Sequence, residues 1–132
     1  MARSERLDIR SSDDVVRARQ LTRTLATEAG LSLVDQTKII TAASELARNT
    51  LDYGGGGSVM VELIEQMGRR GVRLTFEDKG PGIADVEAAL KDGFTTGKGM
   101  GLGLGGAKRL SNEFSIASKP GGGTKVVIAR WK

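Results

Sequence analysis

Residues 97–104 read Gly-Lys-Gly-Met-Gly-Leu-Gly-Leu and lie within a glycine-dense segment, Gly93–Gly106, that leads into a helical pattern. Alternating glycines leave backbone N–H groups free to surround an anion, and the N-terminus of the following helix adds a positive dipole. Lys98 would add charge beside a terminal phosphate. A plain linker is the weaker alternative, because Leu102 and Leu104 alternate with the glycines. The segment therefore predicts a phosphate-binding loop.

Three other glycine motifs do not fit. A Walker A loop needs four residues between its first glycine and Gly-Lys-Ser/Thr, but only three separate Gly93 from Gly97, and Gly99 follows Lys98. Residues 101–106 match G-x-G-x-x-G, but no strand of a βαβ unit precedes them, as the dinucleotide fingerprint requires. A conventional protein kinase is excluded because the chain is too short and has no His-Arg-Asp catalytic loop.

The flanking sequence predicts a mixed α/β chain. Alternating apolar residues indicate strands, and apolar residues at helical spacing indicate helices. The expected order is a strand at 7–10, a helix capped by Ser11–Asp14 that ends at Gly30, a helix from Ser32 that ends before Gly54, strands around 59–63 and 72–76 joined by a turn at 68–71, helices at 83–90 and 107–110, and strands at 114–118 and 124–131. We expect one domain, 1–132, built as a two-layer α/β sandwich with a mixed, mostly antiparallel sheet and helices on one face.

The amino-acid composition excludes several kinds of catalytic and metal site. The 132 residues include 20 Lys and Arg against 16 Asp and Glu, a net charge of +4, and neither cysteine nor histidine. Thiolate nucleophiles, disulfides, Cys/His zinc sites and histidine bases are therefore excluded. No apolar run is long enough to span a bilayer, and the N-terminus lacks the apolar core of a secretory signal, so we expect a cytoplasmic protein without a membrane partner.

The C-terminal part is basic. Residues 105–132 hold six Lys and Arg against Glu113 alone. The chain has only five aromatic residues to stack on bases, so we do not expect a nucleic-acid partner. We interpret these cations as a solvated face.

Glu45 and Asn49 lie four residues apart in the second expected helix, so both side chains project from one face. A carboxylate can take a proton or orient a nucleophile, and an amide oxygen can bind a hard cation such as Mg²⁺. A solvated helix face with an internal hydrogen bond is the alternative, and for this pair alone it is favoured.

Asp78, Gly80 and Gly82 follow a strand directly. An aspartate at a strand end can accept a hydrogen bond from an exocyclic amine such as adenine N6, and glycines let a flat ring approach the backbone. Taken alone, an ordinary Asp-Lys-Gly-Pro-Gly turn is favoured.

Taken together and in this order, the three segments resemble the N, G1 and G2 boxes of the GHKL (Bergerat-fold) ATPases. Gly121–Thr124 resembles the glycine–threonine element that closes the phosphate site of that superfamily. Relatives with transducer domains are larger than this chain, and histidine kinases carry a phospho-acceptor histidine that it lacks. The segments are most similar to the anti-sigma-factor and serine kinase branch, in particular to switch kinases of the bacterial stressosome.

The resemblance implies ATP- and Mg²⁺-dependent phosphorylation of serine or threonine on STAS-domain regulatory proteins, and activation of a PP2C-type phosphatase by the released kinase. An anti-sigma factor that sequesters a sigma subunit is the alternative. The resemblance also implies the site roles: Glu45 acts as base or orients the hydroxyl, Asn49 binds Mg²⁺, Asp78 recognises adenine beside Gly80 and Gly82, Thr124 helps close the site, and the lid over the phosphates comprises Gly97, Lys98, Gly99, Met100, Gly101, Leu102, Gly103 and Leu104.

Overall fold

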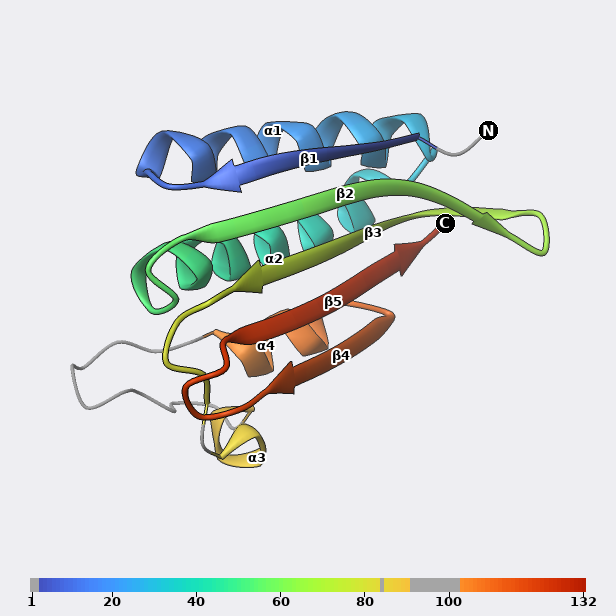
Figure 1. Ribbon diagram of the computed structural model, residues 1–132. Helices are drawn as coiled ribbons and strands as arrows, with labels where there is room; N and C mark the ends of the chain where they lie inside the picture. Colours follow the sequence, from blue (N-terminus) through green and yellow to red (C-terminus); the bar gives the residue numbers. More distant parts are fainter. Residues whose placement is uncertain (1–2, 84, 91–102) are drawn as a thin grey trace.

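The computed structural model describes residues 3–83, 85–90 and 103–132 (Figure 1). The elements are β1 (Arg3–Ile9), α1 (Ser12–Glu28), α2 (Leu33–Asp52), β2 (Gly57–Gln66), β3 (Arg69–Asp78), α3 (Val86–Ala89), α4 (Leu104–Arg109), β4 (Glu113–Ser118) and β5 (Thr124–Trp131). This is the order of strands and helices that the sequence predicts.

The strands form one five-stranded sheet in the order β1-β2-β3-β5-β4, and every neighbouring pair is antiparallel. Figure 1 shows α1, α2 and α4 on one face of this sheet. The prediction of a two-layer α/β sandwich with helices on one face is therefore confirmed, and the sheet is fully antiparallel rather than mixed.

The core lies between the sheet and the two long helices. Val61 of β2 and Leu74 of β3 are cross-strand partners that are fully buried, as are Leu25 of α1 and Ile39 of α2. Burying each such side chain contributes about 1.5–3 kcal/mol. The alternation along β2 and β3 therefore fixes which sheet face the helices cover.

Helix α2 begins as expected, because the N–H of Asp35 donates to the Ser32 hydroxyl at 3.1 Å. The expected cap of α1 is different. The Ser11 side chain makes no capping hydrogen bond to the helix backbone, and the Asp14 carboxylate instead accepts from the N–H of Arg10 at 2.9 Å. The carboxylate therefore satisfies a backbone donor just outside the helix.

The turn between β2 and β3 consists of two residues, Met67 and Gly68, whereas the sequence predicts a four-residue turn at 68–71. Met67 and Gly68 both have positive φ, 53° and 77°, and Gln66 pairs with Arg69. Positive φ at both central residues is the signature of a type I′ hairpin turn, whose twist matches that of the strands. The expected turn at 68–71 was therefore wrong, because methionine gives no signal for positive φ.

Two helix boundaries also differ from expectation. Helix α3 spans Val86–Ala89 rather than 83–90, and the N–H of Ile83 donates to the Ser118 hydroxyl at 2.7 Å. Helix α4 begins at Leu104, so two glycines that were expected in the loop are helical. Leu104 and Ala107 are fully buried, so packing outweighs the poor helix propensity of glycine.

Candidate active site

Helix α2 presents the two polar side chains of the first motif at the edge of the core. Glu45 is exposed and Asn49 is half-buried, while Leu46 and Ala47 between them are buried. The helix therefore packs one face and leaves the carboxylate accessible.

Gly103 brings the end of the glycine segment to Glu45. Its φ is +67°, and a Cβ built on it would lie 2.6 Å from Glu45 Oε2. Leu104, the next residue, begins α4 and is fully buried. One residue of the predicted lid, Gly103, therefore lies beside the predicted catalytic carboxylate.

The C-terminal end of α2 meets the Asp78 segment. The carbonyl of Asn49 accepts the N–H of Gly54 at 3.1 Å. A Cβ on Gly54 would lie 2.5 Å from Cγ of Asp78, and a Cβ on Gly80 would lie 2.7 Å from Cα of Gly54. The motif on the helix and the motif after β3 are thus joined through Gly54, a contact that no local sequence pattern predicts.

Asp78 is a half-buried carboxyl at the end of β3. Burial raises its pKa above the usual range, while hydrogen bonds from the N–H groups of Gly80, at 2.9 Å, and Thr124 oppose that rise. These two donors favour the ionised form, which only accepts hydrogen bonds.

The turn after Asp78 is fixed by contacts within the protein. A Cβ on Gly82 would lie 1.8 Å from the carbonyl oxygen of Lys119, and Gly82 has a φ of +75°. The Tyr53 hydroxyl donates to the carbonyl of Gly82 at 2.7 Å. Glycine at this position is therefore required by the packing of one turn on another. Contact of Gly80 and Gly82 with a base stays a prediction.

Thr124 is the cross-strand neighbour of Asp78 and is buried. Its hydroxyl lies 2.8 Å from that of Ser118, on β4. Ser118 is not among the predicted site residues, although the alternation of β4 and β5 places it on the same sheet face as Thr124.

The remaining lid residues, Gly97–Leu102, lie outside the described residues. Their contact with phosphate stays a prediction.

Two cavities of about 330 and 270 Å³ border Asp78 and Lys79. The first is also lined by Ala117 and Lys125, the second by Arg6, and Glu77 lines both. In the strand register, Glu77, Ala117 and Lys125 stand side by side and alternate with Asp78, so their side chains point away from the helices. Neither cavity is lined by Glu45 or Asn49, but the first is also lined by Ser118 and Thr124 and therefore reaches the predicted base end of the nucleotide site.

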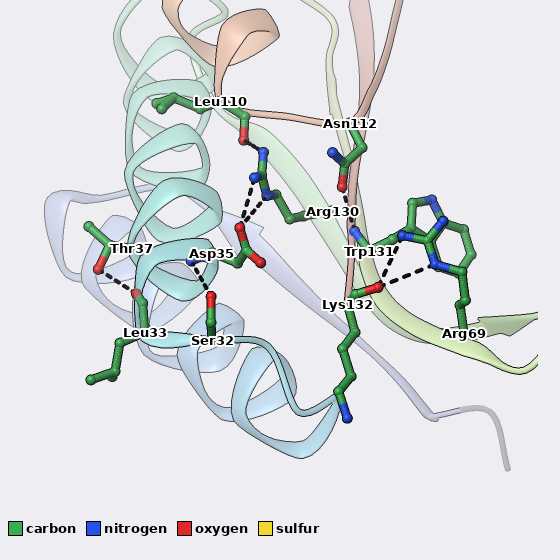
Figure 2. A network of polar contacts seen from close by, with 10 residues as sticks. All are labelled: Ser32, Leu33, Asp35, Thr37, Arg69, Leu110, Asn112, Arg130, Trp131 and Lys132. Atoms are coloured by element: carbon green, nitrogen blue, oxygen red, sulfur yellow. Dashed lines mark hydrogen bonds and ion pairs between the residues drawn. The ribbon is translucent and has the colours of Figure 1, made fainter.

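An arginine of β5 forms an ion pair with the start of α2 and a hydrogen bond with the residue that follows α4 (Figure 2). Arg130 of β5 donates to Asp35 Oδ1 from Nη2 at 2.8 Å and Nε at 3.2 Å, and from Nη1 to the carbonyl of Leu110 at 3.2 Å. The Arg130 side chain is only 14% exposed, and its hydrogen bond lowers the pKa of Asp35. The expectation that Arg130 belongs to a solvated basic face was wrong, because α4 and α2 enclose it.

The described residues include no group of three or more Asp and Glu side chains arranged to hold a metal ion. Magnesium commonly binds proteins through one or two side chains while keeping waters and substrate phosphates as its other ligands, so Asn49 alone remains a chemically suitable ligand. No helix in the described part of the chain is long and apolar enough to cross a membrane.

Comparison with known proteins gives consistent matches. The family model for histidine kinase-, DNA gyrase B-, and HSP90-like ATPases matches residues 34–132. The serine/threonine-protein kinase RsbT of Bacillus subtilis (strain 168) is 47% identical over 118 residues, which cover 89% of each chain. The anti-sigma F factor of Thermoanaerobacter sp. (strain X514) is 28% identical over 119 residues, covering 86% of this chain and 82% of that protein.

The fold is also seen in solved structures. The crystal structure of the RsbU and RsbW domains of a Mycobacterium tuberculosis protein matches 100% of this chain with a TM-score of 0.67 and 21% sequence identity, and this chain spans 33% of its length. This likeness supports the fold, and the sequence matches support the family. The chain belongs to the family of histidine kinase-, DNA gyrase B-, and HSP90-like ATPases, and within it is an RsbT-like serine/threonine protein kinase.

Proposed function

We propose that this kinase, acting as a single domain over residues 1–132, transfers the γ-phosphoryl group of ATP to a serine or threonine of a STAS-domain protein in a partner-switching pathway. The observation that carries the proposal is the convergence of the end of the glycine segment on Glu45, with α2 joined to Asp78 through Gly54. Identity of 47% to a serine/threonine-protein kinase supports the same reaction.

The base of ATP is assigned to the Asp78 end. The Asp78 carboxylate accepts a hydrogen bond from the exocyclic amine of adenine. Thr124 of β5, the cross-strand partner of Asp78, completes that end of the site. The described part of the lid reaches Glu45 at Gly103. The triphosphate therefore runs from Asp78 toward Glu45, and Gly97–Leu104 supply the predicted phosphate-binding lid.

In the transfer step, the substrate hydroxyl oxygen forms a bond to the γ-phosphorus while the bond from that phosphorus to the β,γ-bridging oxygen breaks. ADP leaves with the electron pair, and Glu45 accepts the hydroxyl proton. When bound, Mg²⁺ neutralises charge on the phosphates, and Asn49 would hold it. Phosphoryl transfer depends mainly on positioning and charge neutralisation, so a site without histidine is sufficient.

Glu45→Gln tests the assignment. Purified kinase, a STAS-domain protein and labelled ATP with Mg²⁺ should yield phosphoserine or phosphothreonine with the wild-type chain. The variant should lose about 10²–10⁴-fold in rate while still binding ATP, since general-base contributions have this size. Glu65→Gln is the matched control. Glu65 is exposed near the C-terminal end of β2, and it is the other end of β2, at Gly57, that pairs with Asp78.

Unchanged transfer by Glu45→Gln would remove Glu45 from the mechanism. No phosphorylation of any STAS substrate by the wild-type chain, together with copurification of a sigma factor whose transcription it inhibits, would favour the anti-sigma role instead. The 28% identity to an anti-sigma factor makes that second assay worth including. A PP2C-type phosphatase is the further partner that we propose for the released kinase.

A further inference from the structure

Ser118 holds three hydrogen-bonding groups around one hydroxyl. Its Oγ accepts the N–H of Ile83 at 2.7 Å, lies 3.1 Å from the carbonyl oxygen of Gly123, and lies 2.8 Å from Thr124 Oγ1. The side chain is half-buried on β4, next to the strand that carries Thr124. We propose that Ser118 is a positioning residue that makes Thr124 an acceptor only and thereby selects the nucleotide base; the proposal rests on the nucleotide site proposed above.

The donor count decides the direction of the bond between the two hydroxyls. A serine hydroxyl has one hydrogen and two lone pairs. If Ser118 donates to the Gly123 carbonyl, it can accept from both Ile83 and Thr124, and all three contacts are hydrogen bonds. If it donates to Thr124 instead, the contact with the Gly123 carbonyl is lost.

Each hydrogen bond adds a net stabilisation, so the arrangement with three bonds is favoured over the arrangement with two. Thr124 has only 8% of its surface exposed, so water offers its hydroxyl few alternative partners. The single hydrogen of Thr124 is therefore committed to Ser118, and only lone pairs of Thr124 Oγ1 remain for a ligand.

With this arrangement, both side chains at the base end of the site act as hydrogen-bond acceptors. Asp78 and Thr124 are cross-strand neighbours on the same sheet face. Burial raises the pKa of Asp78, and its carboxylate accepts hydrogen bonds from the backbone N–H groups of Gly80 and Thr124, which oppose that rise. Both side chains then present acceptors. Adenine offers an amine donor at position 6, whereas guanine offers a carbonyl oxygen there, which two acceptors would repel.

The experiment measures dissociation constants for ATP and for GTP, each with Mg²⁺, and uses their ratio as the readout. Ser118→Ala frees the Thr124 hydroxyl to rotate and donate to a guanine carbonyl. We expect the preference for ATP to fall about three- to tenfold, the equivalent of one neutral hydrogen bond, mainly through tighter GTP binding. Ser118→Thr keeps the hydroxyl and should restore the wild-type ratio.

Ser115→Ala is the matched control, because Ser115 is exposed on the same strand and points to the opposite sheet face. Thr124→Val gives an independent test, since it keeps the shape of the side chain and removes its lone pairs. It should weaken ATP binding and reduce the preference for ATP even if Ser118→Ala does not fold.

The outcomes separate the two proposals. A wild-type preference for ATP that is unchanged in Ser118→Ala, or in Thr124→Val, would overturn the role of Ser118 and leave the kinase site intact. A wild-type chain that binds ATP and GTP equally would overturn the proposed base site together with the role of Ser118. A reduced preference in Ser118→Ala that Ser118→Thr restores supports the proposal, because a general loss of stability would not change the ratio.

Discussion

Arg130, on the last strand, donates two hydrogen bonds to one carboxylate oxygen of Asp35, 95 residues earlier in the chain, at the start of α2. A third hydrogen bond from the same guanidinium reaches the carbonyl of Leu110, directly after α4. One side chain thus connects the helix that carries Glu45 with the helix that follows the predicted lid (Figure 2).

Because of this ion pair, the free energy of unfolding should decrease at acidic pH. The pKa of Asp35 is lowered in the folded chain, so the stabilisation is present above the unfolded value of 3.8 and is lost as the pH falls through the folded value. With the Asp35 side chain 27% exposed, we expect the contribution to be about 1 kcal/mol. In Asp35→Asn, the free energy of unfolding should fall at neutral pH and show a weaker decline below pH 4.

Denaturant unfolding at a series of pH values measures this effect. Asp8→Asn is the control, because Asp8 pairs with Arg10 in an exposed position and removal of its charge should change the free energy of unfolding little. An acid-dependent decline of the same size in Asp35→Asn and the wild-type chain would contradict the expectation.

Gly103→Ala should disturb catalysis more than folding. The new Cβ would lie 2.6 Å from Glu45 Oε2, so the flexible carboxylate must move aside. A left-handed backbone with a side chain costs about 1–2 kcal/mol. We expect kcat for phosphorylation to fall at least tenfold with a modest decrease in melting temperature.

Gly106→Ala is the matched control for that variant, because a Cβ there meets nothing within 4 Å and the residue is helical. It should stabilise the chain by up to about 1 kcal/mol and keep full activity. Equal kcat for the two variants would show that displacement of Glu45 does not matter.

Tyr53→Phe should loosen the turn after Asp78. It removes the hydrogen bond from the hydroxyl to the carbonyl of Gly82, which is 2.7 Å long. We expect a loss of about 1 kcal/mol in the free energy of unfolding and weaker ATP binding by a few fold. Calorimetry for binding and denaturant unfolding for stability test the two parts, and unchanged ATP affinity would show that the turn keeps its shape without this bond.

Asp78→Asn should separate stability from binding. Burial raises the pKa of Asp78 in the folded chain, so its favourable effect on stability exists below the unfolded value and is lost as the pH rises through the folded value. At pH 7 the variant should therefore be no less stable than the wild-type chain. Its ATP affinity should fall at least tenfold, because the amide group of asparagine can place an N–H donor where the carboxylate accepts a hydrogen bond from the adenine amine. A large loss of stability with unchanged ATP affinity would contradict both expectations.

The sequence by itself determined the elements and the chemistry that they carry. Alternation along β2 and β3 and the apolar stripes of α1 and α2 are local patterns with fixed periods, so the strands, the helices and the side of the sheet that they cover follow from them. The absence of histidine and cysteine, and the spacing of Glu45 and Asn49, are likewise visible without a structure.

The tertiary structure alone decided the contacts between those elements. Gly54 against Asp78, Gly103 against Glu45, Ser118 beside Thr124 and Arg130 enclosed by α2 and α4 all join residues from different elements. Such contacts depend on how the helices pack on the twisted sheet, and a pattern in neighbouring residues does not predict that packing. For the same reason the glycines of α4 were expected in a loop, although the burial of Leu104 and Ala107 makes them helical.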